Sequence, residues 1–185
     1  MFIFLKDFIG PVANIELMNV LDGTQTKRRA RTMSRVEDFV KKVEGLEGAA
    51  NKLLIVTGKP GSGKSKVLRE AADDKGWDYV DCRLLITEEF LELLPADRQE
   101  KAAEIMGDIL AGYNSQVILL DRVQTFFVPV FHIDVADLLL KLSEKFTIVV
   151  AWPGYLDKGQ LCYDKFDGTE SIRVPADNLE IWNIE

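Results

Sequence analysis

The sequence predicts a three-layer α/β fold, in which helices cover both faces of a mainly parallel sheet. Three short apolar runs rich in β-forming residues lie at 52–57, 117–121 and 146–152, as expected for strands buried on both faces. Segments with apolar residues at helical spacing separate these runs, and such alternation is typical of parallel sheets. The 185 residues are enough for one domain with a proper core.

The first 33 residues differ from the rest, and we expect them to form an N-terminal extension. They lack sustained apolar periodicity and contain the basic run KRRAR at residues 27–31. A solvated, disordered lead-in is the favoured interpretation. A biological start at Met33, with the upstream stretch an extension, is a separate hypothesis. A DNA-binding arm formed by residues 27–35 is the alternative. The folded domain is then expected over residues 34–185.

A helix is expected to begin at Ser34, because Ser34 and Glu37 match a capping box. Gly48 is expected to end it. The apolar residues of one helical face are Val36, Phe39, Val40 and Val43.

A glycine-rich loop follows the strand at 52–57 and precedes the next helix. Its sequence, GKPGSGKS at residues 58–65, fits the Walker A pattern G-x-x-x-x-G-K-[ST], in which backbone N–H groups surround a triphosphate. Gly61 and Gly63 allow backbone conformations that a Cβ would block, and a helix N-terminus favours an anion. The expected nucleotide-binding residues are Gly58, Lys59, Pro60, Gly61, Ser62, Gly63, Lys64, Ser65 and Lys66.

The chain between the loop and residue 112 predicts one more strand and two more helices. Gly76 interrupts the helix after the loop, and residues 77–82 resemble a strand. Thr87 can cap a short helix that Pro95 ends. A longer helix follows, ends at Gly112 and has an apolar face formed by Ala102, Ile105, Met106, Ile109 and Leu110.

The strand at 117–121 reads VILLD and matches a Walker B pattern. In a parallel sheet Asp121 would emerge at the carboxyl edge, beside the glycine-rich loop. We therefore expect ATP and Mg²⁺ as cofactors. Lys64 would contact the β- and γ-phosphates, and Ser65 and Asp121 would hold the metal, directly or through water.

The last third of the chain predicts a helix and four strands. Asp134 can cap a helix, and residues 146–152 form the next strand. Residues 161–163 and 171–174 flank Asp167-Gly168 and predict a hairpin, and alternation at 179–184 predicts a terminal strand.

A strand at 77–82 lies between the two motifs along the chain. This arrangement resembles the additional-strand branch of P-loop NTPases, which includes the AAA+ and STAND groups. The resemblance implies the sheet order 5-1-4-3-2, with the strand at 146–152 between the two motif-bearing strands and Trp152 near the sensor position. Beyond this sheet we expect a C-terminal β-hairpin extension and no lid domain.

From about residue 34 the chain also resembles the F component, the small P-loop subunit, of type 3 BREX phage-exclusion systems. The likeness rests on the loop at 58–65, LLPADR at 93–98, LLDRVQ at 119–124 and TIVVAWPG at 147–154. It implies an ATP-binding ATPase or nucleotide switch inside a cytoplasmic anti-phage assembly. The implied partners are other defence proteins and further copies of the chain.

One position departs from the additional-strand pattern. Many such ATPases follow the Walker B Asp with a Glu that activates water, whereas here Asp121 is followed by Arg122. Gln124 can orient a water instead, and slow intrinsic hydrolysis is expected. Arg98 is the first choice for an arginine that reaches a neighbour's γ-phosphate. The expected catalytic residues are therefore Lys64, Asp121, Gln124 and Arg98, with Arg83 and Arg122 as further candidate fingers.

Composition excludes several other classes of site. The chain has one histidine, His132, and two isolated cysteines, Cys82 and Cys162, so zinc sites and His-based triads lack material. No apolar run reaches the length of a membrane span. The net charge is −7, which argues against wholesale nucleic-acid binding. DNA contact is expected only indirectly or through residues 27–35.

Two other nucleotide-using classes remain as alternatives. A small-molecule phosphotransferase of kinase type has a similar size but needs an arginine-rich lid after Walker B. Only Arg173 follows Arg122 in this chain. A GTPase needs an N-K-x-D motif, and residues 164–167, which read DKFD, match it only in part.

Overall fold

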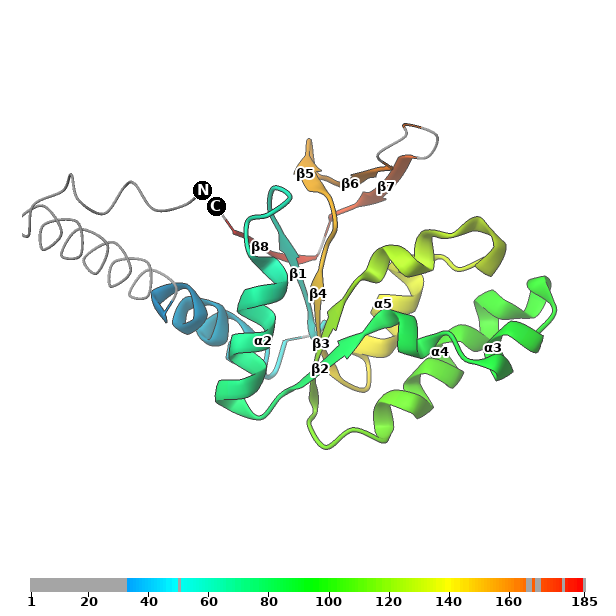
Figure 1. Ribbon diagram of the computed structural model, residues 1–185, viewed down its shortest axis with the longest axis horizontal. Coiled ribbons are helices and arrows are strands. Elements are labelled where there is room, and N and C mark those ends of the chain that lie inside the picture. The colour runs from blue at the N-terminus through cyan, green and yellow to red at the C-terminus, as the bar shows by residue number, and fades with distance from the viewer. Residues whose placement is uncertain (1–32, 50, 166–167, 169–170, 178, 185) are drawn as a thin grey trace, which may run out of the picture. The chain divides into compact units, whose positions relative to one another are not determined.

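The computed structural model describes residues 33–49, 51–165, 168, 171–177 and 179–184 (Figure 1). By its contacts the chain divides into two units, Met1–Asp38 and Phe39–Glu185. Apart from Met33, the predicted N-terminal extension, with its basic run, lies outside the described residues. Asp167 of the predicted hairpin turn does too.

Residues 33–44 are helical. Because Met33 already belongs to this helix, Ser34 lies inside it, and the predicted capping box at Ser34 is wrong. The helix ends at residue 44, before Gly48, which is the last residue of the turn at 45–48 and has a φ of +88°. From Phe39 onward its apolar side chains are buried, and the Phe39 ring lies 5.3 Å from that of Trp182.

Five parallel strands form the main sheet, which confirms the α/β class and the parallel pairing. The strands are β1 (Leu53–Thr57), β2 (Asp78–Asp81), β3 (Val117–Asp121), β4 (Thr147–Ala151) and β8 (Glu180–Asn183). Their order is β2-β3-β4-β1-β8. The sheet therefore places β4 between β1 and β3, and all carboxyl ends lie along one edge.

The predicted order 5-1-4-3-2 differs from this order at its fifth strand. The structure forms eight strands in its described part, and the fifth, β5, belongs to a separate sheet. The strand beside β1 is β8, whose residues Ile181 and Trp182 pair with Ile55 and Val56. The difference arises because β5 has only three residues, all exposed, and has no apolar alternation to predict it.

Helices lie on both faces of the main sheet (Figure 1). On one face, α2 (Lys64–Lys75) buries Val67, Leu68, Ala71 and Ala72. On the other lie α4 (Pro95–Ala111) and α5 (Val135–Ser143), which pack on each other. A short helix, α3 (Glu88–Glu92), precedes α4. The described residues also form the 3₁₀ turns η1 (Cys82–Leu85), η2 (Val123–Phe127) and η3 (Pro129–Phe131).

Two predicted helix caps are confirmed. The Thr87 hydroxyl accepts a hydrogen bond from the Phe90 N–H at 3.4 Å, and the Asp134 carboxylate accepts one from the Asp137 N–H at 3.1 Å. Both helices therefore begin where a side-chain acceptor satisfies a backbone donor of the first turn.

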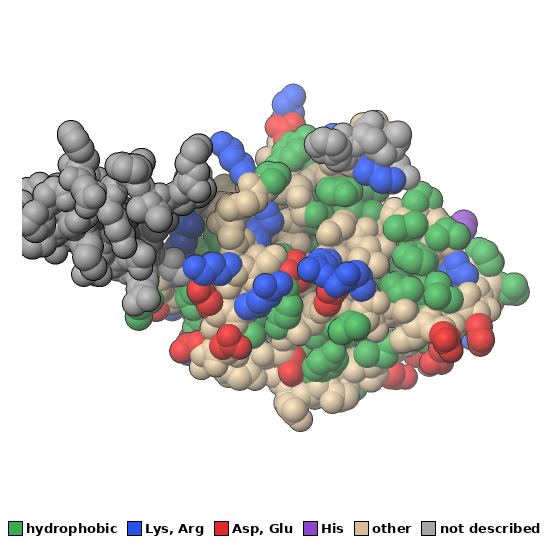
Figure 2. Space-filling view, in the orientation of Figure 1, with side chains coloured by type: hydrophobic (Ala, Val, Ile, Leu, Met, Phe, Trp, Pro, Cys, Tyr) green, Lys and Arg blue, Asp and Glu red, His purple; other side chains and the backbone are tan. Residues whose placement is uncertain are grey.

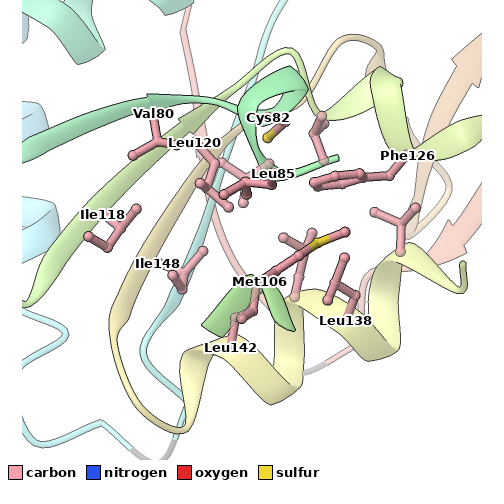
Figure 3. Packing of buried hydrophobic residues seen from close by; sticks show 14 of the residues in the cluster. Val80, Cys82, Leu85, Met106, Ile118, Leu120, Phe126, Leu138, Leu142 and Ile148 are labelled. Carbon is pink, nitrogen blue, oxygen red and sulfur yellow. The ribbon is translucent and has the colours of Figure 1, made fainter. Parts of the chain in front are cut away.

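The larger core fills the space between the sheet and helices α4 and α5 (Figure 3). Alternate strand residues such as Val80, Ile118 and Ile148 meet Met106 of α4 and Leu142 of α5 there. The intervening strand residues face α2, since successive side chains of a strand point to opposite faces. Burial on both faces explains why the central strands are nearly continuous apolar runs.

A three-stranded antiparallel sheet lies between β4 and β8 along the chain. It consists of β5 (Tyr155–Asp157), β6 (Gln160–Asp164) and β7 (Ser171–Pro175). The predicted hairpin is β6 and β7, so it is an insertion before the last strand and not a C-terminal extension. Gly154, directly before β5, allows β6 to approach closely, because a Cβ there would meet the Cys162 carbonyl oxygen at 1.7 Å.

Candidate functional site

The glycine-rich loop connects β1 to α2 at the carboxyl edge of the sheet. Gly61 and Gly63 have φ angles of +79° and +97°, which residues with a Cβ rarely adopt. Gly63 is the N-cap of α2 and has no side chain to bond the first N–H groups of that helix. These donors have no intrahelical partner, so the loop presents them at the positive end of the helix dipole.

Gly58 is required by packing as well as by conformation. Its φ is +148°, and a Cβ at this position would lie 2.5 Å from the Ile184 carbonyl oxygen and 2.8 Å from Ser62 Oγ. Residues 59–62 also line a hollow of about 560 Å³ together with Asn183 and Ile184. The loop therefore lies between β8 and α2, next to a space of the size that ligand sites have.

Lys64 lies at the centre of the loop region. Its ammonium donates to the carbonyl oxygens of Gly58 at 2.6 Å and of Lys59 at 3.3 Å. Burial lowers the pKa of Lys64, and the negative charge of Asp121 partly opposes this effect. Lys64 and Asp121 therefore lie within electrostatic range of each other.

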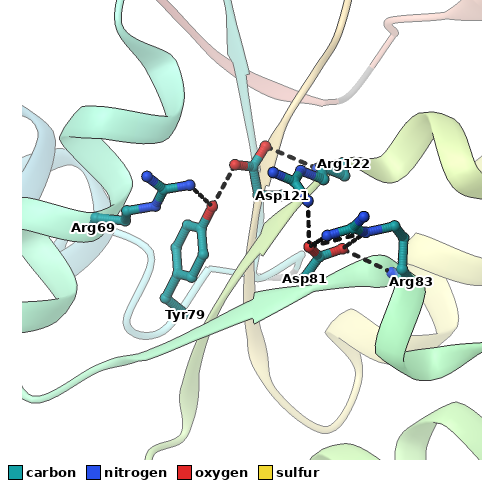
Figure 4. Close-up of polar contacts among 6 residues, drawn as sticks. All are labelled: Arg69, Tyr79, Asp81, Arg83, Asp121 and Arg122. Atoms are coloured by element: carbon teal, nitrogen blue, oxygen red, sulfur yellow. Dashed lines mark hydrogen bonds and ion pairs between the residues drawn. The ribbon is translucent and has the colours of Figure 1, made fainter.

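Asp121 ends β3, and its side chain is held at both carboxylate oxygens. The residue is only 6 % exposed. Its Oδ1 accepts the N–H of Arg122 at 2.8 Å, and its Oδ2 accepts the hydroxyl of Tyr79 (Figure 4). Arg122 itself adopts a left-handed conformation, with a φ of +60°, which is uncommon outside glycine.

Tyr79 lies on β2, and Arg69 of α2 contacts it from the other side (Figure 4). The Nη2 of Arg69 donates to the Tyr79 hydroxyl oxygen at 3.1 Å, and its guanidinium lies 5.1 Å from the ring centroid. Burial, followed by the hydrogen bond to Asp121, raises the pKa of Tyr79. The phenol is therefore neutral at physiological pH and acts as a donor toward Asp121.

Asp81 ends β2 directly beside Asp121, since the two residues are paired in the sheet register. Arg83 contacts it through Nε and Nη2, at 2.7 to 3.1 Å, and Arg122 through Nη1 at 2.8 Å. The hydrogen bonds from the Arg83 side chain lower the pKa of Asp81 to about 2, against the opposing effect of burial. Asp81 therefore remains ionised and holds two arginines beside the site.

The other residues that the sequence singled out differ in how exposed they are and in what they contact. Ser65 is the second residue of α2 and is partly buried. Lys66 pairs with Glu70 one turn later at 3.6 Å, and its side chain is 64 % exposed. Gln124 lies in η2, three residues after Asp121, and is partly exposed. Trp152 is only 1 % exposed and donates to the Cys162 carbonyl at 3.0 Å, so it acts in the core.

The structure opposes the predicted role of Arg98 as a finger for a neighbour's phosphate. Arg98 is only 9 % exposed. Its guanidinium donates to the carbonyl oxygens of Leu91 at 2.8 Å, Leu93 at 3.2 Å and Val130 at 2.6 Å. These bonds fix the corner between α3, α4 and η3. Proximity to Pro95 in sequence suggested a free helix start, whereas the side chain points inward.

Three residues of the site were missed by sequence reasoning: Arg69, Tyr79 and Asp81. A signal for Asp81 was present, because it ends the strand at 77–82 as Asp121 ends the strand at 117–121. Adjacent parallel strands bring such ends together. Nothing in the sequence pattern singled out Arg69 or Tyr79, since their contact depends on how α2 packs on β2.

The donor set suits Mg²⁺ bound together with a phosphate ligand. The described residues contain no group of three or more His, Cys, Asp or Glu side chains that would hold a metal alone. Mg²⁺ is commonly held by one or two carboxylates plus phosphate oxygens and water, which Asp121 and Ser65 can complete. Within the loop, Ser62 Oγ is buried and has no hydrogen-bond partner in the described chain, so a polar ligand would satisfy it.

No helix in the described part of the chain is both long enough and apolar enough to span a bilayer. Comparison with protein-family models gave no match, and the curated proteins gave none either.

Proposed function

We propose that this chain binds ATP with Mg²⁺ at residues 58–66 and Asp121, and acts as a nucleotide-dependent switch with slow ATP hydrolysis. The observation that best supports this proposal is where the structure has the loop and the two charged residues. The glycine-rich loop opens α2 at the carboxyl edge of a parallel sheet, and Lys64 of that loop lies within electrostatic range of Asp121. Ligands of open parallel sheets bind at this edge.

Backbone groups would supply most of the contacts with the phosphates. The first N–H groups of α2 point out of the helix and favour an anion. Lys64 now bonds two carbonyl oxygens of its own loop, and these are weak competitors for an ammonium compared with a phosphate anion. Lys64 therefore exchanges its loop carbonyls for phosphate oxygens when ATP binds.

Ser65 and Asp121 would hold Mg²⁺ beside the β- and γ-phosphates. The metal supplies charge neutralisation on the phosphate oxygens. The chain itself supplies a carboxylate whose charge is not cancelled by an arginine: the described bonds to Asp121 come from a phenol and a backbone N–H. The neighbouring Asp81 holds the arginines instead.

Hydrolysis is proposed to be slow because neither of the two carboxylates described at this edge of the sheet suits a general base: Asp121 is the proposed metal ligand, and Asp81 is bound by two arginines. Arg122 follows Asp121, and Asp81 is ion-paired with a pKa of about 2, which makes it a poor base. Gln124 can only orient a water. General-base help is commonly worth about 10²–10⁴-fold in rate, so steady-state turnover should fall well below the enzyme median of about 10 s⁻¹.

The proposed setting is a multi-protein assembly, following the resemblance to the phage-exclusion component. Other defence proteins or further copies of the chain are the proposed recipients of an ATP-driven change. DNA is proposed to act only through such partners or through residues 27–35.

Calorimetric titration with Mg·ATP tests the binding site. Lys64→Ala should weaken binding by about tenfold or more, since hydrogen bonds to charged groups contribute about 1.5–3 kcal/mol. Lys75→Ala is the matched control, because this lysine lies in the last turn of α2, away from the loop, and pairs with Glu44. Equal affinity of wild type and Lys64→Ala would refute the site. Phosphate release measured with and without a panel of metabolites distinguishes the switch from a phosphotransferase.

A further inference from the structure

Tyr79 makes an unusual contact with the carboxylate that is proposed to hold the metal. It lies two residues before Asp81 on β2, so its side chain is on the sheet face that Asp81 and Asp121 share. From there its hydroxyl reaches Asp121 Oδ2 on the neighbouring strand (Figure 4). The contact is thus built by two strands of the sheet and not by a loop.

Arg69 determines which way the phenol's hydrogen points. A guanidinium can only donate, so the 3.1 Å bond from Arg69 Nη2 occupies a lone pair of the Tyr79 oxygen. The hydroxyl hydrogen is then directed to Asp121. The guanidinium also lies over the ring, 5.1 Å from its centroid, and this contact holds the ring in place.

The other carboxylate oxygen is fixed independently. The Arg122 N–H binds Asp121 Oδ1 at 2.8 Å. An ionised carboxylate has about four lone-pair positions, so two donors leave acceptor positions for a metal or its water. With a donor on each oxygen, the plane of the carboxylate cannot rotate freely. Removing one donor would release that rotation without removing the charge.

We propose that Tyr79 is a positioning residue for the metal: it fixes the Asp121 carboxylate for Mg²⁺, and Arg69 orients Tyr79. This inference rests on the proposed function, because it concerns the same nucleotide site. Arg69 belongs to α2, the helix that begins in the glycine-rich loop. The two hydrogen bonds Arg69–Tyr79 and Tyr79–Asp121 therefore connect the helix that begins in the phosphate-binding loop to the carboxylate proposed to hold the metal.

Tyr79→Phe is the direct test, since it keeps the ring under Arg69 and removes only the hydroxyl. ATP affinity is measured by calorimetry at graded Mg²⁺ concentrations and in excess EDTA. Residues that orient metal ligands typically change metal affinity by about 10–100-fold. The variant should need about tenfold more Mg²⁺ for half-maximal enhancement of ATP binding, while its ATP affinity in EDTA stays that of wild type.

Tyr155→Phe is the matched control. Tyr155 also donates its hydroxyl to a carboxylate, Asp164, at 2.8 Å, but in the small antiparallel sheet. Its removal should leave the Mg²⁺ dependence unchanged. Arg69→Ala should shift the Mg²⁺ dependence in the same direction as Tyr79→Phe, because the phenol then loses its orientation.

The measurements distinguish a failure of the proposed role of Tyr79 from a failure of the proposed ATP binding. If wild type binds Mg·ATP and Tyr79→Phe has the same Mg²⁺ dependence, Tyr79 has no positioning role but the nucleotide site stands. Equal weakening with Mg²⁺ and in EDTA would indicate a merely structural residue, and tighter Mg²⁺ binding would mean that the phenol competes with the metal. Either result overturns the inference. If wild type binds no ATP in either condition, the proposed function itself fails.

Discussion

Asp81 and Asp121 end neighbouring strands of the sheet, yet the two carboxylates have different partners. Asp81 binds Arg83 and Arg122, whereas Asp121 accepts bonds from neutral donors (Figure 4). The charge of Asp81 is therefore cancelled locally, and that of Asp121 remains available to a cation. Figure 2 shows Lys and Arg side chains close to acidic ones on one face of the molecule.

The pairing at Asp81 predicts a specific pH dependence of stability. Its pKa is about 2 in the folded chain, below the ordinary value of 3.8. Because the folded pKa is the lower one, the pairing stabilises the fold above about pH 4 and is lost as pH falls toward 2. Asp81→Asn should therefore unfold at a lower urea concentration than wild type. The difference between the two urea midpoints should be constant between pH 5 and 7 and should become smaller below pH 4.

Urea unfolding of wild type and Asp81→Asn at pH 3 to 7 measures this gap. Asp164 also has a pKa lowered to about 2, through Ser171, Tyr155 and Arg173, and Asp164→Asn provides a comparison in the antiparallel sheet. A gap at Asp81 that is independent of pH across the whole range would contradict the ion-pair explanation.

Sequence reasoning located the charged residues of the two motifs but not their partners. A motif fixes the order of residues along one segment, so residues 58–65 and Asp121 were predictable. Tyr79 and Arg69 meet only because β2 lies beside β3 and α2 covers both. Arg98 shows the reverse error, because its place at the start of α4 suggested exposure while packing turned it inward.

At the scale of elements, Arg98 joins α3, α4 and η3 through three backbone carbonyls. A lysine has one ammonium and cannot reach three carbonyls that a planar guanidinium spans. Hydrogen bonds from a charged group such as this guanidinium contribute about 1.5–3 kcal/mol each. Arg98→Lys should therefore destabilise the fold by about 2 kcal/mol or more, without changing Mg·ATP affinity below its melting range.

Chemical unfolding and calorimetry on the same samples check both halves of that prediction. Arg173→Lys is the control, since Arg173 is an exposed partner of Asp164 and surface changes usually stay within about 0.5 kcal/mol. If Arg98→Lys keeps full stability but loses ATP-dependent association, Arg98 contacts a neighbour's phosphate and the structural role is wrong.

The accuracy of the element predictions follows the strength of each local signal. The central strands were predicted because burial on both faces makes them continuously apolar, and the caps at Thr87 and Asp134 because a side-chain oxygen precedes an apolar face. The three exposed residues of β5 gave no such signal. Ser34 failed as a cap because the helix already includes Met33, which no residue pattern at 34–37 reveals.

At the scale of the whole molecule, burial within the helix at 33–44 begins at Phe39. Phe39, Val40 and Val43 are buried, as is Leu46 just beyond the helix, whereas no residue from 33 to 38 is. A chain beginning at Met33 should therefore melt within about 2 °C of the full chain and bind Mg·ATP equally well. A chain beginning at Glu47 loses those four apolar side chains and the contact of Phe39 with Trp182.

Each buried apolar side chain contributes about 1.5–3 kcal/mol, and 1 kcal/mol shifts the melting temperature by about 2–4 °C for a chain of this size. The shorter chain should thus melt at least 10 °C lower, or fail to fold. Thermal melting followed by tryptophan fluorescence compares the three chains. A drop of several degrees on removing residues 1–32 alone would show that they stabilise the domain.

Assembly of the chain should depend on the γ-phosphate of ATP. Within the described chain, Arg98 is committed to the core, so a cation that contacts the γ-phosphate from a neighbour must come from another position. Arg83 is the best placed: its side chain is 62 % exposed, it follows β2 at the carboxyl edge, and Asp81 holds it in a fixed orientation. Because only ATP has the γ-phosphate, ATP but not ADP should promote association with further copies or with partners.

Light scattering of the purified chain with Mg·ATP and Mg·ADP, alone and with proteins that co-purify from the host, measures this difference. Arg83→Ala should abolish the ATP-dependent increase in mass, while Arg173→Ala, which removes an arginine from the small sheet, should not. Arginines that act in trans contribute about 10³–10⁵-fold to phosphate hydrolysis in other systems, so assembly should also raise turnover. A chain that stays monomeric and unpartnered with both nucleotides would exclude the switch and favour the phosphotransferase alternative.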